Sequence, residues 1–87
     1  LQIDTGTILI DGDDAAIIAA AVPHAAHFHA SEPNMVPVGS LASDHRALGA
    51  ALRQAGYAGW KSVEMTTVEN WRQALRNAAR LMADAYA

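Results

Sequence analysis

The sequence predicts an α/β fold with a parallel sheet, because strand-like and helix-like segments alternate along its 87 residues. Three segments show the alternation of apolar and polar residues that is typical of strands, at residues 1–4, 25–30 and 60–65. Helical patterns follow them, at residues 15–22, 44–55 and 68–85. A chain of this length has room for one small core, so residues 1–87 are expected to form a single unit.

Turn-forming residues delimit the elements in the first half of the chain. Leu1 and Ile3 alternate with polar residues until the pair Thr5-Gly6, which predicts a turn after the first strand. The acidic turn at residues 11–14 precedes an Ala-rich run, where its carboxylates favour the positive end of a helix. Pro23 then stops this helix, and the second strand follows.

The second half of the chain carries stronger helix signals. Residues 31–41 contain two prolines and a glycine and predict a long irregular loop. Ser43 or Asp44 is expected to cap the next helix, and Gly56 follows it where a left-handed residue is favoured. Thr67 is the expected cap of the last helix. The apolar stripe expected along that helix consists of Trp71, Leu75, Ala78, Ala79 and Met82.

Several conspicuous side chains are expected to have ordinary structural roles. Trp60 and Trp71 are expected to pack in the core or between a helix and the sheet. His45 lies beside a helix cap, where a solvated side chain is the simplest expectation. His24 precedes the second strand and is also expected at the surface.

Composition excludes several classes of protein. Apolar residues make up 52% of the chain and charged residues 17%, which is too apolar for a disordered segment. No apolar run is long enough to span a bilayer, and the net charge of −3 argues against a nucleic-acid partner. The lack of cysteine excludes disulfides and thiolate metal sites. Because no signal-peptide pattern occurs, a cytoplasmic location is the default expectation.

One polar residue of metal-ligand type stands near the end of each predicted strand: Asp4, His29 and Glu64. Parallel α/β sheets place their active sites at the carboxyl ends of their strands, so these three side chains are expected to meet there. Taken alone, each residue has an ordinary structural alternative. Asp4 could be a turn residue, His29 an interior hydrogen-bonded histidine and Glu64 a salt-bridge partner. Together, their carboxylate and imidazole groups predict a site for a divalent cation.

Three motifs resemble a known family. They are Leu-Gln-Ile-Asp-Thr-Gly at residues 1–6, His-Phe-His-Ala-Ser-Glu-Pro-Asn at residues 27–34, and Gly-Tyr-Ala-Gly-Trp with Ser-Val-Glu-Met at residues 56–65. In order and spacing they resemble the xylose isomerase-like sugar isomerases and epimerases, in particular ketose 3-epimerase-type proteins. The resemblance implies a (β/α)8 TIM barrel, of which this chain would be about three C-terminal βα units. The chain also begins inside its first strand, so we expect the N-terminal part of a single barrel domain to be absent from it.

The resemblance also implies roles for individual residues. Asp4, His29 and Glu64 match three of the family's four metal ligands, for a divalent ion such as Mn, Mg, Co or Zn. Glu64 also matches one of two catalytic glutamates that exchange a proton with the substrate. His27 and Glu32 match positions that line the substrate site. The second glutamate would lie on an earlier strand that this sequence does not contain.

Two positions depart from the family pattern. Thr7 stands where these epimerases have a histidine, three residues after the metal-binding aspartate. Met35 stands where they have a substrate-binding arginine, six residues after the metal-binding histidine. Both departures weaken the expectation of the standard ketose substrate, and neither alters the three metal ligands.

The implied function is therefore a part of a metal-dependent sugar isomerase or epimerase that moves a proton next to a carbonyl through an enediolate. We expect the isolated chain to be inactive and not to be a stable monomer, because its sheet edges need the missing barrel portion or further copies of itself. One alternative is a non-catalytic half-barrel fragment or assembly subunit. A less favoured one is an endonuclease IV-like phosphodiesterase, which the acidic first half of the chain argues against.

Overall fold

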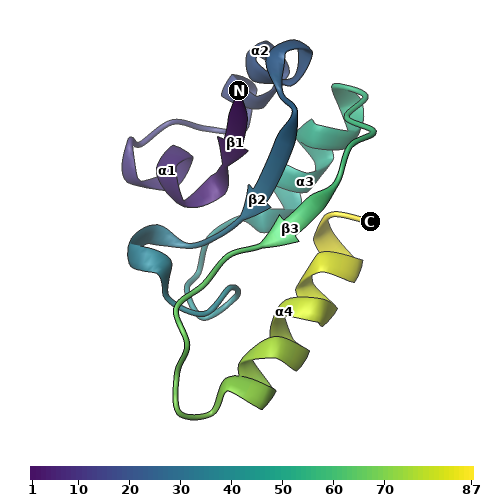
Figure 1. The fold of residues 1–87 in the computed structure, drawn as a ribbon. Helices are drawn as coiled ribbons and strands as arrows, with labels where there is room; N and C mark the ends of the chain where they lie inside the picture. Colours follow the sequence, from purple (N-terminus) through teal and green to yellow (C-terminus); the bar gives the residue numbers. More distant parts are fainter.

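A computed structural model describes all residues, 1–87, and its centre is a parallel sheet of three short strands (Figure 1). The strands are β1 (Gln2–Asp4), β2 (His27–Ala30) and β3 (Lys61–Val63), and they lie in the order β1-β2-β3. Both neighbouring pairs are parallel. The predicted α/β class with about three βα units is confirmed, since every strand is followed by helical structure before the next begins.

The helical elements flank this sheet and also follow the carboxyl ends of its strands (Figure 1). The α-helices are α1 (Thr5–Ile10), α2 (Ala16–Ala21), α3 (His45–Gln54) and α4 (Trp71–Ala85), and the short 3-10 turns are η1 (Val22–His24) and η2 (Pro33–Met35). The acidic turn before α2 and the stop near Pro23 agree with the sequence pattern. None of the helices combines the length and the apolarity that crossing a membrane requires.

The register of the strands separates an apolar face of the sheet from a polar one. Ile3 is paired with Phe28, and these residues face the core, where they are 3% and 0% exposed. On the other face, Asp4 is aligned with His29, and His29 with Ser62. The predicted division of each strand into an apolar and a polar side is therefore present in the structure.

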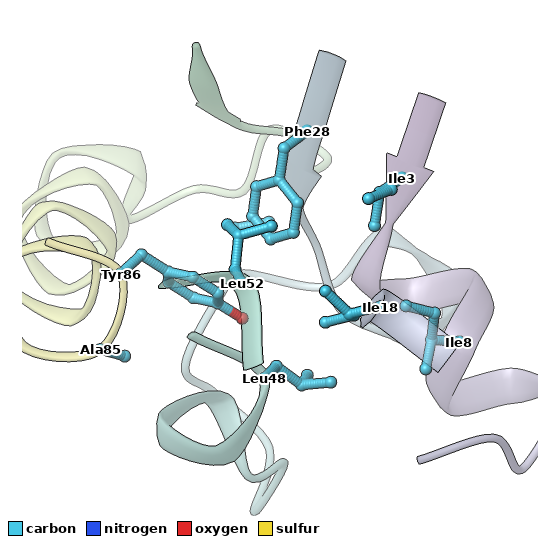
Figure 2. Packing of buried hydrophobic residues seen from close by; sticks show 9 residues of the cluster. Ile3, Ile8, Ile18, Phe28, Leu48, Leu52, Ala85 and Tyr86 are labelled. Carbon is cyan, nitrogen blue, oxygen red and sulfur yellow. The ribbon is translucent and has the colours of Figure 1, made fainter. Parts of the chain in front are cut away.

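Helices α2, α3 and the end of α4 cover the apolar face (Figures 1 and 2). Figure 2 shows the ring of Phe28 against Leu52 of α3, with Tyr86 from the C-terminus beside them. The aromatic rings of Phe28 and Tyr86 have their centroids 5.3 Å apart in a tilted arrangement. Ile18 of α2 is fully buried in the same cluster and extends it toward β1.

The C-terminal residues after α4 are held tightly against α3 and β3. A Cβ atom at Gly49 would lie only 1.8 Å from the carbonyl oxygen of Ala85, so glycine is required for this approach of the two helices. Arg53 donates to the same carbonyl at 2.8 Å, and Lys61 donates to the carbonyl of Tyr86 at 2.6 Å. Two cations thus satisfy the carbonyl groups that the end of a helix leaves unpaired.

Three local predictions are wrong. Helix α1 begins at Thr5, directly after β1, where a turn was expected. Helix α4 begins at Trp71 after Asn70, so Thr67 is not its cap. Its buried face contains Ala74 rather than Leu75, which is 50% exposed.

Three side-chain expectations are also wrong. Trp60 is 83% exposed and Trp71 is 45% exposed, so neither lies in the core. His45 is only 3% exposed instead of solvated. By contrast, Asp44 caps α3 as predicted, since its Oδ1 accepts the amide of Ala47 at 3.0 Å.

Candidate metal centre

The carboxyl ends of the three strands bring Asp4, His29 and Glu64 together. Asp4 is the last residue of β1, His29 is the third residue of β2, and Glu64 directly follows β3. One possible ligand atom from each side chain lies within 4.8 Å of the others. The structure therefore assembles the three residues that the strand pattern singled out.

Asp4 has one oxygen bound by the protein and one without a hydrogen-bond partner. Its Oδ1 accepts the amide of Thr7 at 3.0 Å, the hydroxyl of Thr7 at 3.3 Å and the hydroxyl of Ser31 at 2.8 Å. The first of these contacts is the N-terminal cap of α1, so the helix start also orients the carboxylate. With three donors on Oδ1, the other oxygen, Oδ2, is the atom available to a cation.

His29 and Glu64 contact each other directly. The Nδ1 atom of His29 lies 2.5 Å from Oε2 of Glu64, and the Gln2 amide nitrogen lies 3.0 Å from the same Nδ1. A proton on Nδ1 can hydrogen-bond to this carboxylate, whereas both groups would be ligands if a divalent cation were bound. The side chain of Glu64 is 45% exposed, whereas that of His29 is 19% exposed.

The charge of the cluster favours a cation. The chain has two salt bridges, and both join a histidine to a glutamate. Asp4 and Glu64 therefore approach each other without a lysine or arginine partner, although like charges at this distance repel. A divalent ion would offset both carboxylates, and their oxygens with the imidazole nitrogen form a donor set that suits Mg, Mn, Co or Zn. The residues present fit such an ion.

His27 lies on the same face of the sheet as the cluster. Its ring meets the ring of His29 edge-on, with centroids 4.9 Å apart, and its Nε2 lies 3.3 Å from the hydroxyl of Ser62. The side chain is exposed. These positions leave His27 open to a ligand bound beside the cluster, and its role in substrate binding stays a prediction.

Glu32 is only 1% exposed, whereas a residue that lines a substrate site is expected to be accessible. Its Oε1 accepts the hydroxyl of Ser43 at 2.7 Å, and its Oε2 accepts the amide of Gly39 at 2.8 Å. Oε2 also lies 2.8 Å from Nε2 of His45. The carboxylate thus connects the two ends of the loop that follows β2. Its contact with a substrate stays a prediction.

His45 is the residue that sequence reasoning missed. Besides Glu32, it contacts the hydroxyl of Tyr86, which lies 2.6 Å from its Nδ1. Burial raises the pKa of the Tyr86 hydroxyl well above its usual range, the nearby charge of Glu32 adds to this, and the Thr5 side chain opposes it. The one sequence signal of this buried role was the position of His45 next to an apolar helix face, in a chain with few charged residues.

The two positions that depart from the epimerase pattern both make hydrogen bonds near the cluster. The amide and the hydroxyl of Thr7 donate to Asp4, so this residue supports the cluster even though it lacks an imidazole. Met35 lies in a left-handed conformation with φ of 62°, and its carbonyl accepts the amide of Thr66 at 2.7 Å. This bond joins the loop after β2 to the segment after β3.

Comparison with solved structures finds the same fold in parts of sugar epimerase chains. A D-allulose 3-epimerase from Methylomonas sp. in complex with D-allulose superposes with a TM-score of 0.83 over 99% of this chain, at 19% identity. The fold is that of a 3-epimerase barrel segment. A second structure of the Methylomonas sp. enzyme gives a TM-score of 0.68 over 87% of the chain at 23% identity. A D-psicose 3-epimerase determined in the presence of D-fructose gives 0.67 over 98% of the chain at 25% identity.

The chain spans about a third of the length of these epimerases, namely 36%, 28% and 34% of the three chains. No protein-family model matches the sequence, and no curated protein matches it either. The likeness therefore lies in the fold, which agrees with the barrel-segment architecture expected from the motifs.

Proposed function

We propose that this chain is the C-terminal part of a divalent-metal-dependent sugar isomerase or epimerase. The observation that carries the proposal is the convergence of Asp4, His29 and Glu64 at the carboxyl ends of parallel strands. The likeness to D-allulose and D-psicose 3-epimerases supports a sugar or sugar-like substrate. Asp4, His29 and Glu64 would hold the ion, and a divalent ion bound there would stabilise negative charge that develops on substrate oxygens.

In this proposal Glu64 is also a catalytic base. Its Oε2 contacts His29, whereas its Oε1 has no hydrogen-bond partner, and the side chain is 45% exposed. A free carboxylate oxygen at an open site can take a proton from the carbon beside a carbonyl group. Returning the proton on the opposite face needs a second base, and this chain offers no further carboxylate at the cluster. We therefore expect the isolated chain to be catalytically inactive.

The partner proposed for this chain is the rest of its barrel, or further copies of itself. β1 and β3 are the edges of the sheet, and each has a strand on one side only. An unpaired strand edge is a template for pairing with another chain. The polar face that carries Gln2, His27 and Ser62 also has no helix layer over it, although parallel sheets are normally covered on both faces.

Native mass spectrometry of the purified chain with Mn²⁺ retained tests this proposal. We expect an assembly larger than 9.2 kDa that carries bound divalent ion. Asp4→Asn and Glu64→Gln should each lower the affinity for Mn²⁺ by at least about tenfold, because each removes one charged oxygen ligand. The matched control is Asp13→Asn, an exposed acid in the turn before α2, which should leave Mn²⁺ binding unchanged.

Two outcomes would contradict the proposal. A homo-oligomer that binds no divalent ion would mean that the three residues lie close together without forming a metal site, and the chain would then be a non-catalytic assembly subunit. A monodisperse monomer of 9.2 kDa with a cooperative unfolding transition would refute the need for a barrel partner.

A further inference from the structure

We propose that the buried side chains of Tyr86, His45 and Glu32 form a positioning device for the carboxylate of Asp4. The inference rests on the proposed function in so far as Asp4 is taken as a metal ligand. The three residues come from segments far apart in the sequence: the end of α4, the start of α3 and the loop after β2. All three are buried, and none of their side-chain hydrogen bonds involves His29 or Glu64.

The three side chains are connected and shielded from water. The Tyr86 hydroxyl lies 2.6 Å from Nδ1 of His45, and Nε2 of His45 lies 2.8 Å from Glu32. Their exposed fractions are 1%, 3% and 1%. In Figure 2 the Tyr86 ring lies within the hydrophobic cluster, and its hydroxyl oxygen points past Leu52 toward the region of α3. Buried polar groups without a partner are costly, so each of these contacts is strongly favoured.

The hydrogen-bond directions in this chain of contacts follow from the carboxylate of Glu32. An ionised carboxylate only accepts hydrogen bonds, so Nε2 of His45 carries the ring proton and donates to Glu32. Nδ1 of the neutral ring is then an acceptor, and the Tyr86 hydroxyl, whose pKa is raised by burial, donates a hydrogen bond to it. The tyrosine thereby holds the histidine in the tautomer that Glu32 requires.

Glu32 transmits this constraint to Asp4 through the neighbouring residue. Ser31 is covalently next to Glu32 and is 0% exposed. Its hydroxyl donates to Oδ1 of Asp4 at 2.8 Å and accepts the amide of Gly6 at 2.9 Å. Ser31 and Thr5 also exchange two hydrogen bonds of 2.8 Å, one in each direction. The backbone of Ser31 therefore cannot shift without moving the carboxylate of Asp4.

In many metal sites, further residues hydrogen-bond to the residues that bind the metal. These hydrogen bonds fix the orientation of the ligands, and their removal typically lowers metal affinity by about 10–100-fold. Here, Ser31 is the direct support of Asp4, whereas Tyr86 and His45 act one step further out by holding Glu32. We expect the outer residues to have an effect near the lower end of that range.

The test compares Tyr86→Phe with Tyr57→Phe in the purified chain, in the assembly it forms. The Tyr57 hydroxyl donates to the carbonyl of Trp60 at 2.8 Å, so the control also loses one hydroxyl hydrogen bond, far from Asp4. We expect Tyr86→Phe to weaken Mn²⁺ binding about tenfold and to speed hydrogen exchange of the Gly6 amide by a similar factor. In the unmodified chain, the ¹⁵N shifts of His45 should show a proton on Nε2 and none on Nδ1.

The readouts separate this inference from the proposed function. If the unmodified chain binds no Mn²⁺, the proposed function fails, while the exchange rate of Gly6 and the tautomer of His45 still test the positioning. Equal effects of Tyr86→Phe and Tyr57→Phe on Mn²⁺ affinity and Gly6 exchange would overturn the inference, even if both variants lose stability. If Tyr86→Phe does not fold, Ser43→Ala removes one bond to Glu32 more mildly and should speed exchange of the Gly6 amide in the same way.

Discussion

Replacing Glu32 tests how much stability a buried carboxylate gives to this small fold. The carboxylate accepts three donors, from Gly39, Ser43 and His45, at 2.7–2.8 Å. Glu32→Gln keeps one oxygen for Gly39 and His45, and its amide can donate to the hydroxyl of Ser43. All three bonds then lose the charge of the carboxylate, and bonds to charged groups exceed neutral ones by about 1 kcal/mol each, so the expected cost is about 3 kcal/mol.

Glu32→Leu removes all three acceptor contacts at a similar side-chain volume. The amide of Gly39 and Nε2 of His45 then lose their acceptor. Each of the three lost bonds to the charged carboxylate is worth about 1.5–3 kcal/mol, so the expected cost is about 5 kcal/mol or more. The two variants should therefore differ by at least about 1 kcal/mol, with the leucine variant the less stable.

Urea denaturation at one fixed chain concentration measures both values, because an assembling chain has a concentration-dependent stability. Glu69→Gln is the matched control, since Glu69 is exposed in the turn directly before α4 and its replacement should change the free energy of unfolding by less than about 0.5 kcal/mol. Equal costs for Glu32→Gln and Glu32→Leu, or a cost below about 1 kcal/mol for the leucine variant, would refute the structural role assigned to this carboxylate.

Two further predictions concern the packing around the cluster and the C-terminus. Gly6→Ala should destabilise the chain by about 1–3 kcal/mol in the same denaturation assay, because the added Cβ would lie 2.7 Å from the carbonyl oxygen of Glu32 and 2.8 Å from Oγ of Ser31. Tyr86 has a raised pKa in the folded state, so its stability contribution is present below about pH 10, the unfolded value, and falls as the pH rises above it. Absorbance titration of the Tyr57→Phe variant should accordingly show Tyr86 ionising only as the chain unfolds, and ionisation of Tyr86 near pH 10 in the folded chain would contradict this.

Much of the fold was predictable from local signals. Alternation of apolar and polar residues located all three strands, although each observed strand is shorter than the segment predicted for it. Asp44 and Gly56 delimit α3 as expected, and Gly56 adopts a φ of 78°. The start of α1 was missed, because Thr5-Gly6 also permits a helix when Asp4 caps it and the backbone packs closely on Ser31.

The candidate cluster was predictable for a similar reason. Residues that end neighbouring parallel strands lie at one edge of the sheet, so Asp4, His29 and Glu64 could be expected to meet before any contact was known. The role of Glu32 could not be inferred in this way. Its partners lie up to 13 residues away in the sequence, and none of them is marked by a periodic pattern.

The sequence by itself determined the order of the elements, the polar and apolar sides of the strands and the ligand types at their ends, because these depend on neighbouring residues and on the two-residue period of a strand. Only the tertiary structure decided which side chains are buried. His45 is buried because Tyr86, 41 residues further along, returns to it. Leu75 and Trp71 stay exposed because the buried face of α4 is formed by its alanines, Ala74, Ala78 and Ala85. Burial depends on where distant segments meet, and local patterns carry little information about that.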